Sequence, residues 1–397
     1  MFTVWGKIMQ TRLIKRSACT LASYEAAMKA LNSLQSNAKY LKLASQSNWD
    51  DSCKLHETEK YLLRSGITLE KLDTLSVIHV AGTKGKGSTC AYTEAILREH
   101  GFTTGFYSSP HLVTVKERIR INGEPISQLC FTKYFWEVYN KLDDAKEHEF
   151  DMPTYFKFLT ILMFKIFVDT KVDVAIIEVG IGGLKDCTNI IRNPVCVGIT
   201  SLALDHTSLL GNTLEDIAYQ KSGIFKSQAV AFTVAQQPQA LGVLKKRAVE
   251  VGCTLYIVPP LGEYTWENLS PILRARSNVQ EQNASLAIQL ATAWLLSEAN
   301  KCSTVTHDTA YITKLCDKYN ENIEINSPIG QTQSVEIVSM DKIAMGLSSC
   351  KWSGRMQILR STIADLFLDG AHTIESMECC ISWFIEESSK SNGEKIL

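Results

Sequence analysis

A glycine-rich segment at residues 81–89, AGTKGKGST, constrains the fold more than any other part of the sequence. It follows the short apolar run 75–81 (LSVIHVA), which predicts a β-strand, and it leads into residues 88–100, which predict a helix. A glycine-rich turn between a strand and a helix is typical of phosphate binding, because backbone N–H groups and the helix dipole face the anion. The segment therefore predicts a nucleotide-binding α/β unit.

Two side chains of this loop have the chemistry that a nucleotide requires. Lys86 can reach the β- and γ-phosphates, and the Ser88 hydroxyl can reach a phosphate or Mg²⁺. The spacing differs from the usual G-x-x-x-x-G-K-[ST], because Gly87 separates the lysine from the serine. The alternative is a flexible basic turn, which the flanking strand and helix make the weaker interpretation.

Two further apolar runs, 172–179 (VDVAIIEV) and 195–204 (VCVGITSLAL), predict strands of the same sheet that are covered on both faces. Glu178 and His206 then lie at carboxyl ends of strands, where open α/β sheets place ligands. A carboxylate and an imidazole beside a triphosphate are candidate Mg²⁺ ligands, although each taken alone could equally be a loop or core polar group. Lys221, taken alone, is expected to be a surface charge.

Composition limits the classes of protein to consider. The 397 residues predict two or three domains, and 45% hydrophobic with 21% charged residues is the balance of a globular protein. A net charge of −1 argues against a nucleic-acid coat, and the most apolar stretch, 156–168, is interrupted by lysines and too short for a membrane span. The twelve cysteines form no C-x-x-C pair, which indicates free thiols in a reducing compartment.

The two ends of the sequence differ from the middle. Residues 1–23 carry lysines and arginines but no acidic residue, which favours a mitochondrial targeting segment over an unstructured tail. Residues 24–300 are expected to form the nucleotide-binding domain, beginning with a helix at 24–37, and the polar stretch 301–345 a linker or insertion. Residues 346–397 would begin a C-terminal domain, with a strand at 360–369 and a helix to about 387. One strand and one helix cannot bury a core, so this domain looks incomplete.

A GTPase is the first alternative for the loop. Residues 140–143 read NKLD, which has the form of a guanine-specificity motif, but no aspartate occurs between residues 89 and 140 to supply the D-x-x-G that a GTPase needs. NKLD also continues a helical pattern, so we expect it to lie in a helix.

Seven segments in fixed order resemble the folylpolyglutamate synthase family of the wider Mur-ligase superfamily. They are AGTKGKGST, SSPHLVTVKERIRING at 108–123, MPTYFKFLT at 152–160, EVGIGG at 178–183, DCTNIIR at 186–192, LDHTSLLGNTLEDIAYQKSGIFK at 204–226 and DGAHT at 369–373. The resemblance implies an α/β fold, with a P-loop Mur-ligase-like central domain on a parallel-type sheet and a C-terminal α/β domain that is incomplete here.

The resemblance also assigns roles to residues. The nucleotide loop falls on Gly85, Lys86, Gly87 and Ser88. The magnesium ligands fall on Ser109, Glu178 and His206, together with Lys221, which the family carries as a carbamate. Further nucleotide contacts fall on Asn283, Arg355 and Asp369, and His372 falls close to the reaction centre. Lys86 and His372 are the residues expected to act in catalysis.

The implied reaction is the ATP-dependent addition of L-glutamate to the γ-carboxylate of tetrahydrofolate or its polyglutamates, through an acyl phosphate. ATP and Mg²⁺ are the expected cofactors, with a monovalent cation as a further candidate, and we expect a monomer in mitochondrion and cytoplasm. Two alternatives stay open: a dihydrofolate synthase, and a nucleotide-binding protein without ligase activity. Because the C-terminal domain looks incomplete, we expect this chain to bind ATP but to ligate glutamate weakly or not at all.

Overall fold

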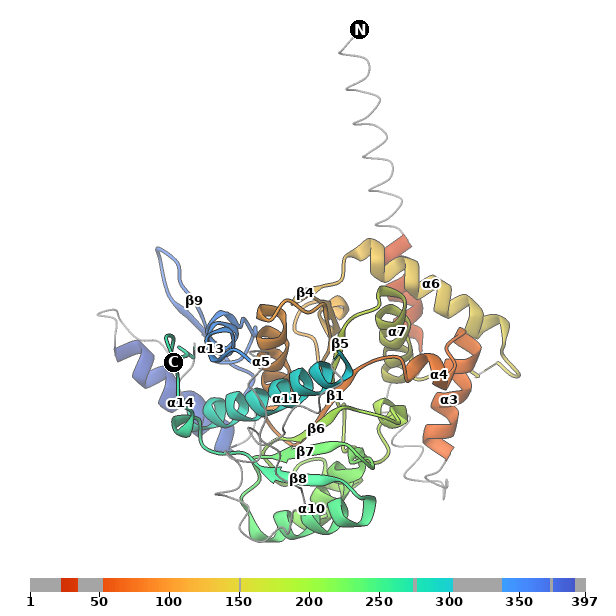
Figure 1. Cartoon of the computed structure of the whole chain (residues 1–397). Coiled ribbons are helices and arrows are strands. Elements are labelled where there is room, and N and C mark those ends of the chain that lie inside the picture. The colour runs from red at the N-terminus through yellow and green to blue at the C-terminus, as the bar shows by residue number, and fades with distance from the viewer. Residues whose placement is uncertain are drawn as a thin grey trace.

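The computed structural model describes residues 23–34, 53–149, 151–273, 277–302, 338–371 and 374–389. Its centre is an eight-stranded sheet in the order β4-β3-β2-β5-β1-β6-β7-β8 (Figure 1). The strands are β1 (Val77–Ala81), β2 (Thr104–Tyr107), β3 (Ile119–Ile121), β4 (Glu124–Pro125), β5 (Val174–Glu178), β6 (Cys196–Ile199), β7 (Val230–Thr233) and β8 (Thr254–Ile257). From β2 to β8 every neighbouring pair is parallel, and only β3 and β4 add antiparallel pairs at one edge.

Helices cover both faces of the sheet. One face carries α5 (Lys86–Glu99), α11 (Asn278–Cys302) and α13 (Met340–Ser349). The other face carries a helix at residues 23–33 with α3 (Cys53–Ser65), α6 (Gln128–Asp144) and α7 (Tyr155–Thr170), and, over β6 to β8, α9 (Leu214–Lys221) and α10 (Pro238–Val251). Short connections are α4 (Leu69–Leu72), α8 (Thr207–Leu210), and the 3-10 turns η1 (Val115–Arg118), η2 (Cys187–Ile190), η3 (Ser222–Ile224) and η4 (Leu261–Glu263).

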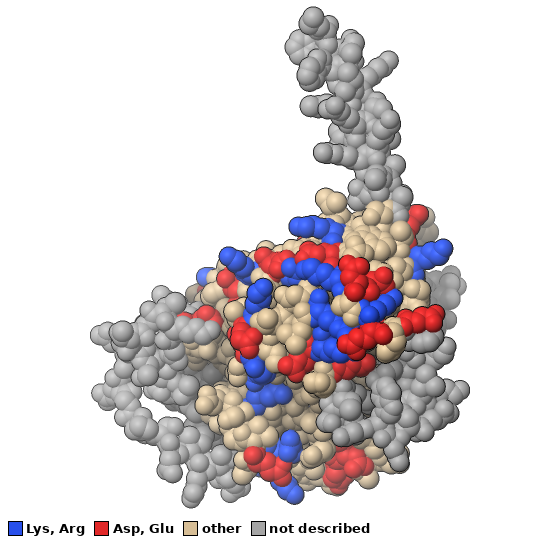
Figure 2. Space-filling model, turned by 90° about the vertical axis from the view of Figure 1, so that its right-hand side faces the viewer, with Lys and Arg blue, Asp and Glu red and all other residues tan. Residues whose placement is uncertain are grey.

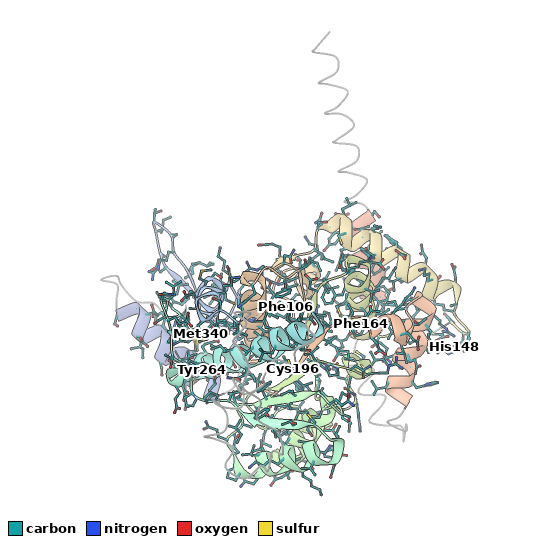
Figure 3. The ribbon with its side chains drawn as sticks, in the orientation of Figure 1. Phe106, His148, Phe164, Cys196, Tyr264 and Met340 are labelled. Atoms are coloured by element: carbon teal, nitrogen blue, oxygen red, sulfur yellow. The ribbon has the colours of Figure 1, made fainter. Side chains whose placement is uncertain are left out.

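The central strands are apolar throughout because both of their faces are buried. In β1, Ile78 and Val80 pack with α5 and α11, while Val77 packs on the opposite side with α7. Figure 3 labels residues of both layers, with Phe106 in the first cluster and Phe164 in the second. The alternation of side chains along a strand thus divides one sheet between two helix layers.

The sequence-based elements of this central part are confirmed. The three predicted strands contain β1, β5 and β6, each shorter than its apolar run, and the predicted helix 88–100 is α5, which begins two residues earlier at Lys86. The NKLD sequence at 140–143 lies inside α6, as expected. The predicted helix at 24–37 is helical from residue 23 to 33, and residues 35–37 lie outside the described chain.

The C-terminal region differs from the expectation in one element. The predicted strand at 360–369 is wrong over most of its length, because only β10 (Leu366–Leu368) is extended and it pairs antiparallel with β9 (Gln357–Leu359). The residues between them form a turn, closed by an ion pair of 2.6 Å between Arg360 and Asp365. The predicted helix is present as α14 (Ile374–Ser389).

Helix α13 crosses the expected boundary at 345/346. It packs closely on α5, because a Cβ added at Gly346 would lie 2.6 Å from the Cα of Ile96. The division into domains stays a prediction, and residues 1–22 and 303–337 lie outside the described chain. None of the described helices combines the length and the hydropathy of a membrane span. The eight cysteines whose side chains are described are free thiols.

Candidate functional site

The loop between β1 and α5 depends on two glycines with positive φ. Gly82 has φ +149° and Gly85, the residue that caps α5, has φ +90°. A Cβ at Gly82 would clash with the Thr200 side chain, and a Cβ at Gly85 would clash with Asn283. Only glycine fits both the backbone and the space. The result is a helix N-terminus without a side-chain cap, whose first N–H groups are available to an anion.

Residues 201–203, which follow β6, hold this loop in place by hydrogen bonds. Thr83 N–H donates to the Ser201 carbonyl at 2.9 Å, and the Thr83 hydroxyl donates to the Ala203 carbonyl at 3.1 Å. Ser201 Oγ in turn donates to the Lys84 carbonyl at 3.1 Å. These contacts were not predicted from the sequence. Their only signal was the polar pair Thr200 and Ser201 inside the apolar run 195–204.

Lys86 and Lys221 meet behind the loop. Lys86 Nζ donates to the carbonyls of Gly82 and Thr83, and Lys221 Nζ donates to the Gly82 carbonyl at 2.7 Å. Lys221, the last residue of α9, is only 3% exposed, so the expectation of a surface charge is wrong. Burial, with the nearby Lys86 charge, lowers the pKa of Lys221 to about 7. A neutral amine is therefore well populated near neutral pH.

Glu178 ends β5 and lies at the same corner. Its Oε2 accepts the Ser109 N–H at 3.0 Å, and a Cβ at Gly87 would lie 3.3 Å from that oxygen. Burial raises the pKa of Glu178, while Lys86 and Arg355 oppose the shift. The ends of β1, β2 and β5 therefore converge, as parallel strands require.

The donor set at this corner suits magnesium in part. The Glu178 carboxylate and the hydroxyls of Ser88 and Ser109 are oxygen donors, which Mg²⁺ prefers, together with phosphate oxygens and water. His206 is less well placed, because its side chain is 49% exposed and its Nε2 lies 3.9 Å from Asp205 Oδ2. Its backbone N–H donates to Asp205 Oδ1. Within the described ranges no three His, Cys, Asp or Glu side chains form a metal cluster.

Asn283 projects from α11 toward the loop. It is 3% exposed, and its Oδ1 accepts a long hydrogen bond of 3.5 Å from the Thr89 hydroxyl. Its Nδ2 is buried without a hydrogen-bond partner. An unsatisfied buried donor is costly, so its position next to Gly85 marks a place where a ligand acceptor would be stabilising.

Three predicted residues come from the C-terminal region. Arg355 Nη1 donates to the Gly354 carbonyl at 3.2 Å, and its charge acts on Glu178. Asp369 Oδ2 accepts the Met356 N–H at 2.7 Å, which ties the end of β10 to the start of β9. His372 lies outside the described residues.

Trp352 is a residue at this site that the sequence analysis did not single out, although it lies in the WSGR segment that contains Arg355. Its ring lies 5.2 Å from Phe106 and carries the Arg120 guanidinium at 5.0 Å. A Cβ at Gly87 would lie 3.0 Å from it. Trp352 therefore places the chain that follows α13 directly beside the loop.

Comparison with known proteins shows the family of this chain. A family model described as the Mur ligase middle domain matches residues 80–256, which include the loop, Glu178 and Lys221. A Caenorhabditis elegans protein described as "Putative folylpolyglutamate synthase" is 42% identical over 94% of this chain and 69% of its own length. The chain belongs to the folylpolyglutamate synthase family.

Two other relatives define how far the family likeness extends. The mitochondrial folylpolyglutamate synthase of Bos taurus is 46% identical over 91% of this chain, and the match spans 60% of the bovine protein. A solved structure described as an FPGS–AMPPCP–folate complex superposes with a TM-score of 0.68 at 25% identity, over 92% of this chain and 80% of that one. The fold is thus the Mur-ligase-like α/β fold that the resemblance implied.

Proposed function

We propose that this chain binds Mg·ATP and serves an ATP-dependent ligase that adds L-glutamate to the γ-carboxylate of tetrahydrofolate or its polyglutamates. The observation that carries the proposal is the meeting of Lys86 and Lys221 at Gly82, beside an uncapped helix N-terminus. Family membership supports the ligase class, and the relative solved with AMPPCP and folate supports both substrate classes.

The loop binds the nucleotide phosphates through its backbone. The first N–H groups of α5 face the β- and γ-phosphates, and Lys86 exchanges its carbonyl partners for phosphate oxygens. Asn283 Nδ2 gains an acceptor from the nucleotide. Arg355 and Asp369 contribute from the C-terminal side. These contacts hold the γ-phosphate in line with the folate carboxylate and stabilise the charge that is transferred.

Glu178, Ser88 and Ser109 would hold magnesium, and His206 is a further candidate ligand. The ion neutralises charge on the triphosphate oxygens when it is bound. We further propose that the Lys221 amine takes up CO₂: the neutral nitrogen attacks the carbon, a proton is released, and a carbamate anion forms. This reaction replaces a buried cation by a carboxylate of the kind that Mg²⁺ binds. The lowered pKa of Lys221 supplies the neutral nitrogen that the reaction needs.

The products follow from ordinary acyl chemistry. Phosphoryl transfer converts the γ-carboxylate into an acyl phosphate, the glutamate amine attacks the acyl carbon, and phosphate leaves. His372 is the candidate for proton transfer at this step. A monovalent cation, a monomeric state and a mitochondrial and cytosolic location complete the proposal. The mitochondrial relative from Bos taurus supports the first of those locations.

A glutamate-incorporation assay tests this function. Labelled L-glutamate should be added to tetrahydrofolate only with ATP, and Lys86→Ala should abolish the reaction. The chain should be assayed beside a version extended with the C-terminal part of the bovine relative, because β9 and β10 leave Leu366 56% exposed and Leu368 42% exposed. Ligation onto dihydropteroate instead of tetrahydrofolate would favour the dihydrofolate synthase. ATP binding without ligation in either version would favour the other alternative, a nucleotide-binding protein without ligase activity.

A further inference from the structure

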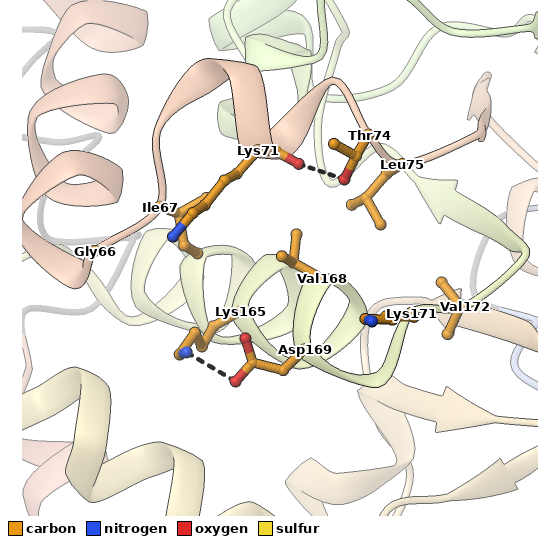
Figure 4. Close-up of a pocket in the computed structure, with 10 residues that line it drawn as sticks. All are labelled: Gly66, Ile67, Lys71, Thr74, Leu75, Lys165, Val168, Asp169, Lys171 and Val172. Atoms are coloured by element: carbon orange, nitrogen blue, oxygen red, sulfur yellow. Dashed lines mark hydrogen bonds and ion pairs between the residues drawn. The ribbon is translucent and has the colours of Figure 1, made fainter.

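A pocket opens where β1 and β5 begin, at the end of the sheet opposite the nucleotide loop. It has a volume of about 440 Å³ and lies between α4, the end of α7 and the segments that lead into β1 and β5 (Figure 4). Leu75 and Val172 line it just before those strands begin, whereas the nucleotide loop follows the end of β1. A five-residue strand spans about 17 Å, so the pocket and the nucleotide loop are separated by about the length of one strand.

The floor of this pocket is apolar. Ile67, Leu75 and Val172 are buried at 2%, 5% and 7% exposure, and Val168 completes the surface from α7. Polar side chains, among them Thr74 and the lysines of the rim, form the rest of the lining, and a mixed concave surface of this volume is of the size that takes a small organic molecule.

The rim is cationic. Figure 4 shows Lys71 on the α4 wall, with Lys165 and Lys171 on the side of α7. Lys165 is neutralised, because its Nζ lies 2.7 Å from Asp169 and 3.2 Å from Glu137. Among the described residues neither Lys71 nor Lys171 forms an ion pair, so two positive charges at the rim have no acidic partner.

The unpaired positive charge at the pocket rim is local, because the surface around it is not generally basic. On the side of the molecule that carries α3, α6 and α7, basic and acidic side chains are interspersed (Figure 2). Lys165 belongs to that pattern, since both of its partners are acidic. Lys71 and Lys171 depart from it at the pocket, where neither has an acidic partner among the described residues.

We propose that this pocket binds a small organic anion, with its hydrocarbon or aromatic body on the apolar floor and its carboxylate or phosphate at the lysine rim. Burial of the ligand's apolar part on the floor favours binding, and the positive charge of the rim favours ligands that are negatively charged. The site is independent of the proposed ligase activity, because it uses none of the residues at the nucleotide loop.

Methyl-labelled NMR of the isoleucine, leucine and valine residues tests this site directly. Phenyl phosphate and benzoate are the anionic probes. Benzyl alcohol is the uncharged aromatic control, and inorganic phosphate is the anion that lacks an aromatic ring. We expect both anions to shift the methyl signals of Ile67, Leu75, Val168 and Val172, with Kd values of about 1 mM. The stronger of the two identifies the head group, phosphate or carboxylate.

A charge-reversed pair provides the matched variant. Lys71→Glu with Lys171→Glu should weaken the anions at least about tenfold and leave benzyl alcohol unchanged, because only the head group loses its partners. Lys245→Glu with Lys246→Glu on α10 is the control of equal charge change, and it should bind as the parent does. The proposal is overturned if neither anion shifts these methyl groups at about 10 mM, or if both reversed pairs bind the anions equally.

Discussion

Lys86 and Lys221 donate to the same oxygen, the backbone carbonyl of Gly82, at 3.1 and 2.7 Å. Two ammonium groups that share one neutral acceptor repel each other, and burial deprives Lys221 of the water that would screen the repulsion. A phosphate or a carbamate between them removes this cost. The proposed nucleotide site would therefore gain from an anionic ligand at this point.

Removal of the Lys86 charge should weaken nucleotide binding and spare the fold. Lys86→Ala loses hydrogen bonds to a charged phosphate, each worth about 1.5–3 kcal/mol, so the Kd for ATP should rise about tenfold to a hundredfold. Titration calorimetry gives the Kd, and circular dichroism checks the fold. Lys246→Ala, on the exposed side of α10, is the control. An unchanged Kd in a folded Lys86→Ala protein would rule out the loop assignment.

Carbamylation of Lys221 should be visible with labelled bicarbonate. Addition of ¹³C-bicarbonate near pH 8, above the pKa of about 7, should produce a carbamate resonance that Lys221→Ala lacks. The variant should also lose activity that short carboxylates partly restore. A bare amine at Lys221 in the active, magnesium-bound protein would contradict the role.

Trp352 should report nucleotide binding by its fluorescence. Its ring lies beside Gly87, so an anion at the loop changes the electrostatic surroundings of the indole. We expect ATP to change the tryptophan emission, and Trp352→Phe to abolish most of that change while the Kd moves less than about threefold. Trp136→Phe, in α6, is the matched control. A full signal in Trp352→Phe would show that the tryptophan does not sense the loop.

Acid should loosen the contact between α5 and α13 through His100. Its Nδ1 donates to the Ile96 carbonyl at 2.8 Å, and its Nε2 accepts the Ser339 N–H at 3.3 Å. Burial lowers the pKa of His100 below 6.5; the nearby Lys342 acts in the same direction, whereas the Ile96 hydrogen bond and Glu99 oppose it. Well above pH 6.5 the His100 imidazole is neutral in both the folded and the unfolded protein. As the pH falls from there through the folded-state pKa, the unfolded state takes up the proton first and stability is lost.

Urea unfolding at pH 7.5 and pH 5.5 measures this effect. The loss is at most about 1.4 kcal/mol per pH unit within the window, and His100→Gln should reduce it because glutamine does not titrate there. His56→Gln, at a side chain that is 84% exposed, is the control. His79, buried with a pKa lowered to about 3, contributes equally to all three proteins. Equal pH dependence in parent and His100→Gln would refute the prediction.

The sequence predicted the parts of the site that depend on local order along the chain. The loop at 81–89, its strand and its helix follow from spacing alone, and Glu178 follows from its place at a strand end. The burial of Lys221 did not follow, because it depends on α9 packing against a loop 139 residues away in the sequence. The Thr83–Ser201 hydrogen bond and the position of Trp352 are likewise contacts between distant segments, which no local pattern encodes.

The close approach of α13 to α5 limits how the site can open. A Cβ at Gly346 would lie 2.6 Å from the Cα of Ile96, so any larger residue at 346 would push α13 away from α5. Any swing of the segment that carries Arg355 and Asp369 has to pivot in the few residues after Ser349. The Trp352 ring, which lies beside Gly87, belongs to this same short segment, so a change in the segment's position would be felt at the loop.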